Sequence, residues 1–331
     1  MFIAVLISAL KLGAEYGNMK IDVLMYADDV VILATCPKEA QLMLDEVSKV
    51  SSTHEIKFNP DKTNLMIFSP KKYDKNLILL LCGQPIVRSN SIKYLGTEIT
   101  SNYNNMKHIE ARKKKVVISI NNLNTSGVMN SQMSIQTKLK LFKVYIKPLL
   151  TYGCELLDLD TNEMSELKKS EGNAIKQIVG IAKKCHTTPL YGALDMESTA
   201  NSILIQQMKF IKRIQSNEYL NEFLKESRKI KNNSGLIGRM IKNNNWNPDL
   251  SVDELNACIE GKIKELSTCR MDTYNSNLEA IEIRKILNLK NHYLKIFTLN
   301  CMLHYTSYGT TAETQISEAL INLNNLKTPH I

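Results

Sequence analysis

Two adjacent carboxylates, Asp28 and Asp29, are the residues of this chain best placed to do chemistry. Apolar runs with the length and β-branched content of strands flank them, at residues 20–25 and 30–34. The pattern predicts a hairpin with both acids at its tip. Neighbouring carboxylates repel each other at neutral pH, and a divalent cation such as Mg²⁺ removes that repulsion. A solvated turn is the alternative, because turns favour Asp.

The stretch Tyr26-Ala27-Asp28-Asp29, with its apolar flanks, resembles the metal-binding hairpin of reverse transcriptases. Residues 24–34 are most similar to the non-LTR (LINE-type) retrotransposon branch of that family. The resemblance implies that Asp28 and Asp29 are catalytic and help to hold two Mg²⁺ ions, one activating a primer 3′ hydroxyl and one steadying the leaving pyrophosphate. It also implies that Tyr26 contacts nucleic acid.

A second motif follows in the order that the family shows. Asn59, Lys62 and Thr63 resemble the segment in which a lysine lies near the incoming triphosphate. The resemblance implies a catalytic role for Lys62, because an ammonium beside a leaving pyrophosphate can neutralise charge or donate a proton. The residues alone equally allow a solvated turn lysine.

A third motif is Tyr94-Leu95-Gly96, which resembles the hairpin that grips the primer strand in this family. The resemblance implies that Tyr94, Leu95 and Gly96 contact nucleic acid. Glycine permits a close approach of the backbone. Tyr94 could also be an ordinary core aromatic residue.

The charge of the chain is concentrated in its middle. The net charge is +9 over 331 residues, but residues 1–100 carry 11 Lys/Arg and 11 Asp/Glu, whereas residues 101–190 carry 14 and 7. Such a local excess favours binding to a polyanion.

Two amphipathic basic helices are expected within residues 107–150. Val116, Ile120 and Leu123 recur at helical spacing in the first, and the second carries a stripe of apolar residues. The stripe of the second helix comprises Leu139, Phe142, Tyr145, Ile146 and Leu149.

Their position after the third motif resembles the thumb of the family, which would contact phosphates without reading sequence. A merely solvated charged face is the alternative. The cations of this region are Lys107, Arg112, Lys113, Lys114, Lys115, Lys138, Lys140, Lys143 and Lys147.

We therefore expect an α+β protein in which a partial polymerase palm, an antiparallel sheet with helices, precedes a mostly helical thumb and tail. The expected domains are residues 1–100 for the palm part, 101–195 for the thumb-like basic region, and 196–331 for a helical C-terminal region. An Asn-rich linker is expected near residues 231–248. A buried helix is expected over residues 1–17, ending near Gly13 or Gly17.

The expected function is that of a fragment of an RNA-directed DNA polymerase. The resemblance begins in mid-palm, so the fingers and the first catalytic aspartate should lie upstream of Met1. Because two-metal transfer needs ligands from more than one strand, we expect the chain alone to be inactive or nearly so. The missing half could act in trans.

Two alternatives remain open from the sequence. The chain could be a nucleic-acid-binding remnant without chemistry, or a different two-metal enzyme such as a nucleotide cyclase. The second needs a nucleotide-binding motif that the sequence does not show, and it leaves the basic helices unexplained.

The implied partners are an RNA template, a DNA primer and a dNTP, without a membrane. The seven cysteines are odd in number, scattered and free of C-x-x-C pairs, which indicates reduced thiols in an intracellular protein. The intact element would work in the nucleus and the cytoplasm.

Overall fold

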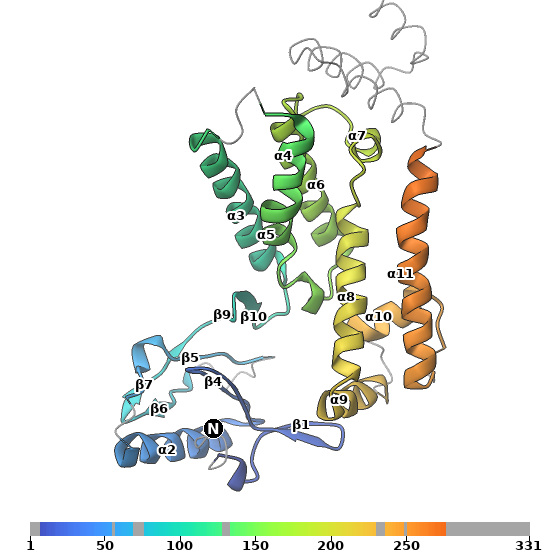
Figure 1. Ribbon diagram of the computed structural model, residues 1–331. Coiled ribbons are helices and arrows are strands. Elements are labelled where there is room, and N and C mark those ends of the chain that lie inside the picture. The colour runs from blue at the N-terminus through green and yellow to red at the C-terminus, as the bar shows by residue number, and fades with distance from the viewer. Residues whose placement is uncertain are drawn as a thin grey trace, which may run out of the picture. The chain divides into compact units, whose positions relative to one another are not determined.

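The computed structural model describes residues 7–54, 57–68, 76–127, 133–229, 236–247 and 250–275. They form an α+β structure of short strand pairs and many helices, as the sequence predicted (Figure 1). The strands are β1 Ala14–Tyr16, β2 Met19–Ile21, β3 Val23–Tyr26, β4 Asp29–Ile32, β5 Asn64–Leu65, β6 Leu80–Leu81, β7 Gln84–Pro85, β8 Val87–Arg88, β9 Ser91–Tyr94 and β10 Thr97–Thr100.

All regular elements that the structure describes after β10 are helical. The helices are α2 Pro37–His54, η1 Pro60–Lys62, α3 Met106–Thr125, α4 Ile135–Leu141, η3 Phe142–Ile146, α5 Lys147–Thr151, η4 Cys154–Leu156, α6 Thr161–Val179, α7 Thr188–Ala193, α8 Thr199–Gln215, α9 Glu218–Lys229, α10 Leu236–Asn243 and α11 Val252–Asn275.

The described residues divide into two compact units that do not follow the chain order. The first unit holds the residues up to His108 together with Ile211–Leu250. The second unit holds Ile109–Phe210 and the residues from Ser251 onward. Helices α3 and α8 each contribute residues to both units.

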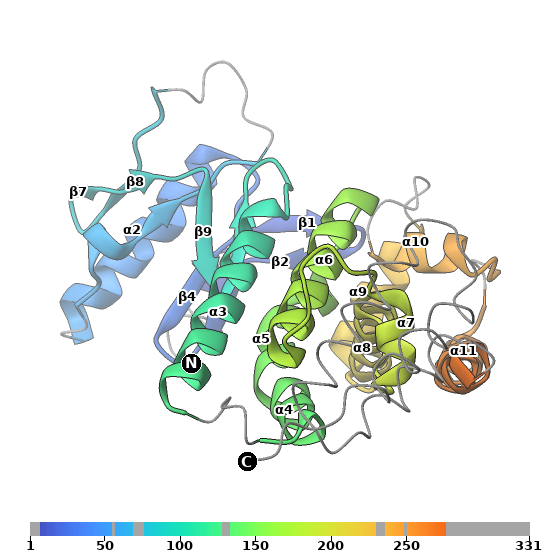
Figure 2. The same cartoon turned by 90° about the horizontal axis from the view of Figure 1, so that it is seen from above.

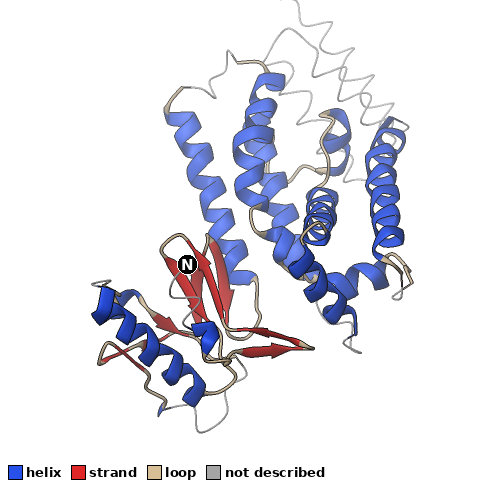
Figure 3. Cartoon of the chain, turned by 60° about the horizontal axis from the view of Figure 1, so that its bottom comes forward, coloured by secondary structure: helices blue, strands red, loops and turns tan. Residues whose placement is uncertain are grey.

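Antiparallel hairpins dominate the strands of the first unit (Figure 3). β1 pairs with β2, β3 with β4, β6 with β7, and β9 with β10, while β5 and β8 form a short parallel pair. Each antiparallel pair is closed by two residues, because the registers place Tyr16 opposite Met19, Tyr26 opposite Asp29, Leu81 opposite Gln84, and Tyr94 opposite Thr97.

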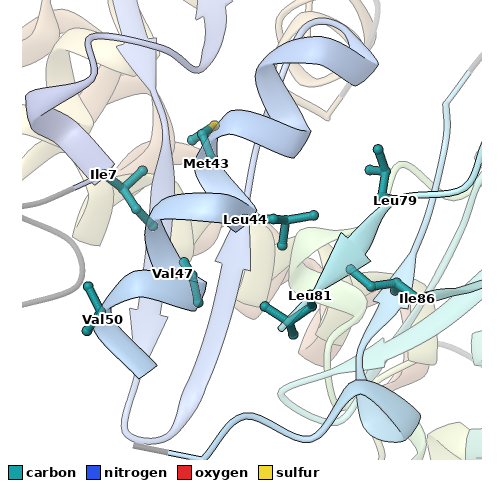
Figure 4. Packing of buried hydrophobic residues seen from close by; sticks show 8 residues of the cluster. All are labelled: Ile7, Met43, Leu44, Val47, Val50, Leu79, Leu81 and Ile86. Carbon is teal, nitrogen blue, oxygen red and sulfur yellow. The ribbon is translucent and has the colours of Figure 1, made fainter. Parts of the chain in front are cut away.

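Helix α2 organises the core of the first unit. Met43, Leu44, Val47 and Val50 recur at helical spacing and are buried. Figure 4 shows these side chains with Ile7 and with the residues that face α2 from the β6–β7 region, Leu79, Leu81 and Ile86. The side chain of Gln41 fixes α2 to β6 by accepting from Leu80 N (2.9 Å) and donating to Leu80 O (3.0 Å).

The N-terminal segment differs in part from the expectation. Helical residues occur at 7–9, whereas β1 begins at Ala14, so the predicted end of the helix near Gly17 is wrong. Gly17 instead occupies the turn between β1 and β2, with φ of 58°. Residues 1–6 lie outside the described part.

The β1–β2 hairpin packs against α9, which follows it by 200 residues in the chain. The rings of Tyr16 and Phe223 stack with centroids 4.3 Å apart and planes 18° apart. Gly17 lies against the buried Glu226, whose Oε2 would stand 2.1 Å from a Cβ added at Gly17. These contacts explain why the segment 211–250 belongs to the first unit.

The second unit is helical. α4 and α5 pack against α6, and α11 packs against α7 (Figure 2). α6 begins with a capping box in which Glu163 N donates to Asp160 Oδ1 at 2.7 Å and Asp160 N donates to Glu163 Oε2 at 2.9 Å. It ends at Gly180, which is left-handed at φ of 85°.

A π-helical turn, η3, interrupts the second basic helix. Lys147 N donates to Phe142 O, five residues back, immediately before Pro148. A proline inside an α-helix lacks a donor and clashes with the carbonyl four residues earlier, and a wider turn relieves that clash. The predicted apolar stripe therefore fails at Tyr145, which is exposed, while Leu150 is buried.

The first basic helix keeps its predicted stripe. Val116 and Ile120 are buried and Leu123 is half-buried in α3. In the stretch expected to be a linker, residues 236–243 form α10. None of the helices in the described ranges combines the length and apolarity needed to cross a membrane.

We predict that Gly17→Ala destabilises the protein, because the new methyl group must displace the buried Glu226 carboxylate and alanine resists a positive φ. The expected loss is about 1–3 kcal/mol in the free energy of unfolding, measured by denaturant titration. The control is Gly261→Ala in α11, where an added Cβ meets nothing within 4 Å. That change should stabilise by about 0.5–1 kcal/mol, and equal effects at both sites would contradict the packing described.

Candidate active site and nucleic-acid interface

The register of β3 and β4 determines where the two carboxylates lie. Tyr26 faces Asp29 directly across the hairpin, so Ala27 and Asp28 form the turn. Opposed residues share a face of a sheet, which puts Tyr26 and Asp29 on one side of the ribbon. Both acids are exposed, and the Tyr26 side chain is 64% exposed. The predicted hairpin with acids at its tip is present.

The turn itself is strained. Ala27 has φ of 53°, and Asp28 is not among the residues with positive φ. A positive φ at the first turn residue alone is typical of a type II′ turn, in which glycine is preferred. An alanine in this conformation costs of the order of 1 kcal/mol. The strain lies directly beside the acids.

The base of the hairpin packs on the protein core, whereas its tip is exposed to solvent. Val23 and Ile32 face each other across the strands and pack on the core around α2. Leu33 N donates to Asp22 O at 2.7 Å, which extends the pairing below the strands. The hairpin thus holds two solvated carboxylates on a fixed support.

The carboxylate oxygens at the hairpin tip are the type of ligand that Mg²⁺ prefers. Mg²⁺ takes oxygen ligands and is often held by one or two protein carboxylates plus substrate phosphates. Asp28 and Asp29 supply such oxygens. In the described part of the chain no group of three or more His, Cys, Asp or Glu is placed to hold a metal ion. By itself the pair offers fewer protein ligands than two ions need.

Lys62 ends a short 3₁₀ turn, η1, that its neighbours hold in place. The side chain of Asn59 caps η1 by accepting from the backbone N–H of Asp61 (3.0 Å) and of Lys62 (3.3 Å). Thr63 Oγ1 donates to Asn59 O at 2.9 Å. Asn59 and Thr63 thus shape the turn, and the Lys62 side chain is exposed to solvent.

The β9–β10 hairpin has a turn of a different type. Leu95 and Gly96 both have positive φ, 46° and 80°, as a type I′ turn requires. The Leu95 side chain is exposed and Tyr94 is half-buried. His108, which is fully buried, accepts from Glu98 N through Nδ1 at 3.2 Å and ties the hairpin to the start of α3.

The predicted basic cluster separates into buried and exposed cations. Arg112 is 3% exposed and its guanidinium lies 5.2 Å from the centre of the Tyr152 ring. Lys138 is 5% exposed, and burial lowers the pKa of its ammonium. Lys113 pairs with Glu166 at 2.6 Å. Solvent-exposed residues of this cluster include Lys114, Lys115 and Lys140.

The pairing around Glu166 also shifts its acidity. Hydrogen bonds from Lys113 and Lys169, and then their positive charge, lower the pKa of the Glu166 carboxyl to about 2. The carboxylate therefore stays ionised and neutralises part of the charge of α3. The Glu166 carboxylate therefore lowers the net positive charge with which α3 could attract a polyanion.

Lys143 and Lys147 both donate to backbone carbonyls of the second unit, Lys143 from an exposed position and Lys147 from a largely buried one. Lys143 Nζ donates to Asp195 O at 2.9 Å, and Lys147 Nζ donates to Glu197 O at 2.8 Å. Lys147 also forms an ion pair of 3.2 Å with Glu171, which is fully buried. The hydroxyls of Tyr191 and Thr199 donate to the same carboxylate.

Sequence reasoning did not find this buried acid or its partners. Glu171, Tyr191 and Thr199 come from α6, α7 and α8 and share no spacing pattern. It also missed the contact between Phe68 and Tyr103, whose rings stack 5.3 Å apart. The only signal in the sequence was the aromatic character of these two residues.

Comparison with known proteins identifies the first part of the chain. Residues 1–99 match the family model described as reverse transcriptase (RNA-dependent DNA polymerase). This segment belongs to the reverse-transcriptase family. The reverse-transcriptase segment contains the acidic hairpin, the Lys62 turn and β9. The family as a whole uses divalent metal ions and a nucleic-acid template and primer.

A transposon-derived protein of Caenorhabditis elegans is similar to a longer part of the chain. It is 26% identical over an alignment of 169 positions, which covers 48% of this chain and 56% of that protein. The match thus spans little more than half the length of that relative. It extends the similarity beyond the reverse-transcriptase segment, because an alignment of 169 positions exceeds the 99 residues that the family model covers.

We predict that Lys147→Met destabilises the second unit strongly, because it leaves the Glu171 carboxylate buried without its cation. Removing one partner of a buried pair costs about 3–5 kcal/mol in the free energy of unfolding. Denaturant titration measures the loss. Lys168→Met, at an exposed position of α6, is the control and should change stability by no more than about 0.5 kcal/mol. Similar stabilities for the two variants would show that the pair is dispensable.

Proposed function

We propose that the chain supplies the C-terminal part of the palm and the thumb of a retrotransposon reverse transcriptase of the non-LTR type. The observation that carries the proposal is the β3–β4 register, which exposes two carboxylates at the tip of a hairpin in the segment that matches the family. In this proposal Asp28 and Asp29 bind Mg²⁺, which would activate the primer 3′ hydroxyl and stabilise the pyrophosphate.

The other motif residues take roles around this pair. Lys62 neutralises charge on the triphosphate, and Tyr26 contacts the template–primer. Tyr94, Leu95 and Gly96 hold the primer strand, with the type I′ turn letting the backbone approach closely. The partners are an RNA template, a DNA primer and a dNTP, and the intact element works in the nucleus and the cytoplasm.

The proposal includes a limit on activity. Two carboxylates from one hairpin cannot complete the coordination of two ions, and further ligands must come from another strand. We expect the chain alone to lack polymerase activity and to need a separate polypeptide segment that carries the remaining ligands.

Metal binding gives the first test. Mn²⁺, a paramagnetic substitute for Mg²⁺, should broaden the NMR amide signals of Ala27, Asp28 and Asp29, and added Mg²⁺ should reverse the broadening. Asp28→Ala should weaken this binding at least about tenfold, because a carboxylate ligand is removed. Asp253→Ala, at an exposed acid of α11, is the matched control. Unchanged Mn²⁺ binding in Asp28→Ala would contradict the metal site and show that the two acids are only residues of a solvated turn.

Primer extension gives the second test. With Mg²⁺, an RNA template, an annealed DNA primer and dNTPs, we expect no template-dependent product from the purified chain. A complete reverse transcriptase in the same buffer verifies the assay. Synthesis by the chain alone, abolished by Asp28→Ala, would refute the expected inactivity while supporting the assignment of the metal site.

A nucleic-acid-binding protein without chemistry is the second candidate function. The observation that favours it is the exposure of Lys114 and Lys115 on α3 and of Lys140 on α4, which leaves these cations accessible to phosphates. Arg112 and Lys138 were predicted to take part as well, and in this conformation their burial keeps them from solvent.

The salt dependence of binding tests the role of these cations. Replacing Lys114, Lys115 and Lys140 together by Ala should reduce the slope of log K against log[salt] for a duplex by up to about 2.7, because each phosphate that is no longer neutralised lowers it by about 0.9. Fluorescence anisotropy with an RNA–DNA hybrid measures it. The control is the triple replacement of Lys168, Lys183 and Lys184 by Ala. These lysines are also exposed in the second unit, so the control removes the same amount of charge. Equal slopes for both triple variants would indicate only a general charge effect.

A further inference from the structure

Two aromatic rings of the first unit are stacked on each other at the surface. Phe68, which follows β5, and Tyr103, which follows β10, have ring centroids 5.3 Å apart and planes 28° apart. Their side chains remain 41% and 71% exposed. Single apolar residues at a surface are common, but a stacked pair with this exposure leaves much of each ring in contact with water.

The backbone at Tyr103 is held in an unfavourable conformation. Its φ is 60°, in the left-handed region that aromatic residues rarely adopt. Tyr103 N donates to Thr100 O at 3.2 Å, and Thr100 Oγ1 donates to Asn104 O at 2.8 Å. Because the ring stays exposed, burial does not offset the strain. The turn therefore presents the ring outward at a cost to stability.

The local charge suits a polyanion. Residues 84–108, which contain β9, β10 and this turn, carry Arg88, Lys93 and Lys107 against a single acid, Glu98. Lys93 and Lys107 are exposed. An exposed aromatic surface within a basic segment is the combination that binds single-stranded nucleic acid, since every base has a π-face and every nucleotide a phosphate.

We propose that Phe68 and Tyr103 form a stacking platform for an unpaired base of a nucleic-acid strand. This proposal rests on the proposed function in one respect: it takes the strand that carries the stacked base to be the strand held at Leu95 and Gly96. β10 spans about 13 Å at about 3.3 Å per residue and separates that turn from Tyr103.

Binding of the full chain to a fluorescein-labelled twelve-nucleotide thymidine strand tests the platform, with a twelve-base-pair duplex as the comparison ligand. Tyr103→Gly removes the ring and suits the left-handed backbone, so this variant should fold at least as stably as the parent. Loss of one stacked base should weaken single-strand binding by about 5- to 150-fold. Phe68→Ala should act in the same direction, and Tyr103→Trp should retain binding.

Tyr219→Ala is the matched control, because Tyr219 is an exposed tyrosine of α9 in the same unit. It should leave both affinities unchanged. A selective loss of single-strand affinity in Tyr103→Gly and Phe68→Ala supports the platform. Unchanged single-strand affinity, or an equal loss for single strand and duplex, overturns it. The metal-binding result at Asp28 is independent of this outcome, so the two proposals fail separately.

Discussion

The packing of the base of the β3–β4 ribbon on the core around α2 is the interaction on which the acidic tip depends. The register of the ribbon places Asp28 and Asp29 at the turn. Val23 and Ile32 fix the ribbon in turn by packing on the core around α2. The strained Ala27 and the solvated acids are tolerated at the tip because the base carries the packing energy. Local strain supported by a rigid surrounding is typical of functional sites.

Much of this arrangement could be predicted from local sequence. The strand–turn–strand pattern around Asp28, the amphipathic α2 and the Tyr94-Leu95-Gly96 turn all depend on residues within a few positions of each other. The docking of α9 on the β1–β2 hairpin could not be predicted, since Tyr16 and Phe223 are about 200 residues apart and no periodicity links them. Local patterns fix elements, and only the folded chain fixes which distant elements share a core.

The basic region shows a second limit of sequence reasoning. Charge counts treat Arg112 and Lys114 alike, yet one side chain lies under the Tyr152 ring and the other in solvent. The difference follows from the angular position of each residue on α3 relative to its packed face. Lys147 is a stronger case, because a cation that composition assigns to a polyanion is used to compensate the buried Glu171.

The π-turn before Pro148 has a consequence for the whole second basic helix. An extra residue accommodated in one turn rotates all following side chains by about 100° relative to those before it. The pyrrolidine ring thus sets the phase between Lys140, which faces water, and Lys147, which faces the interior. A helix of ordinary pitch through this region would exchange some inward and outward positions. Lysines that now pair with groups in the protein interior would then point to solvent, and some exposed lysines would be buried.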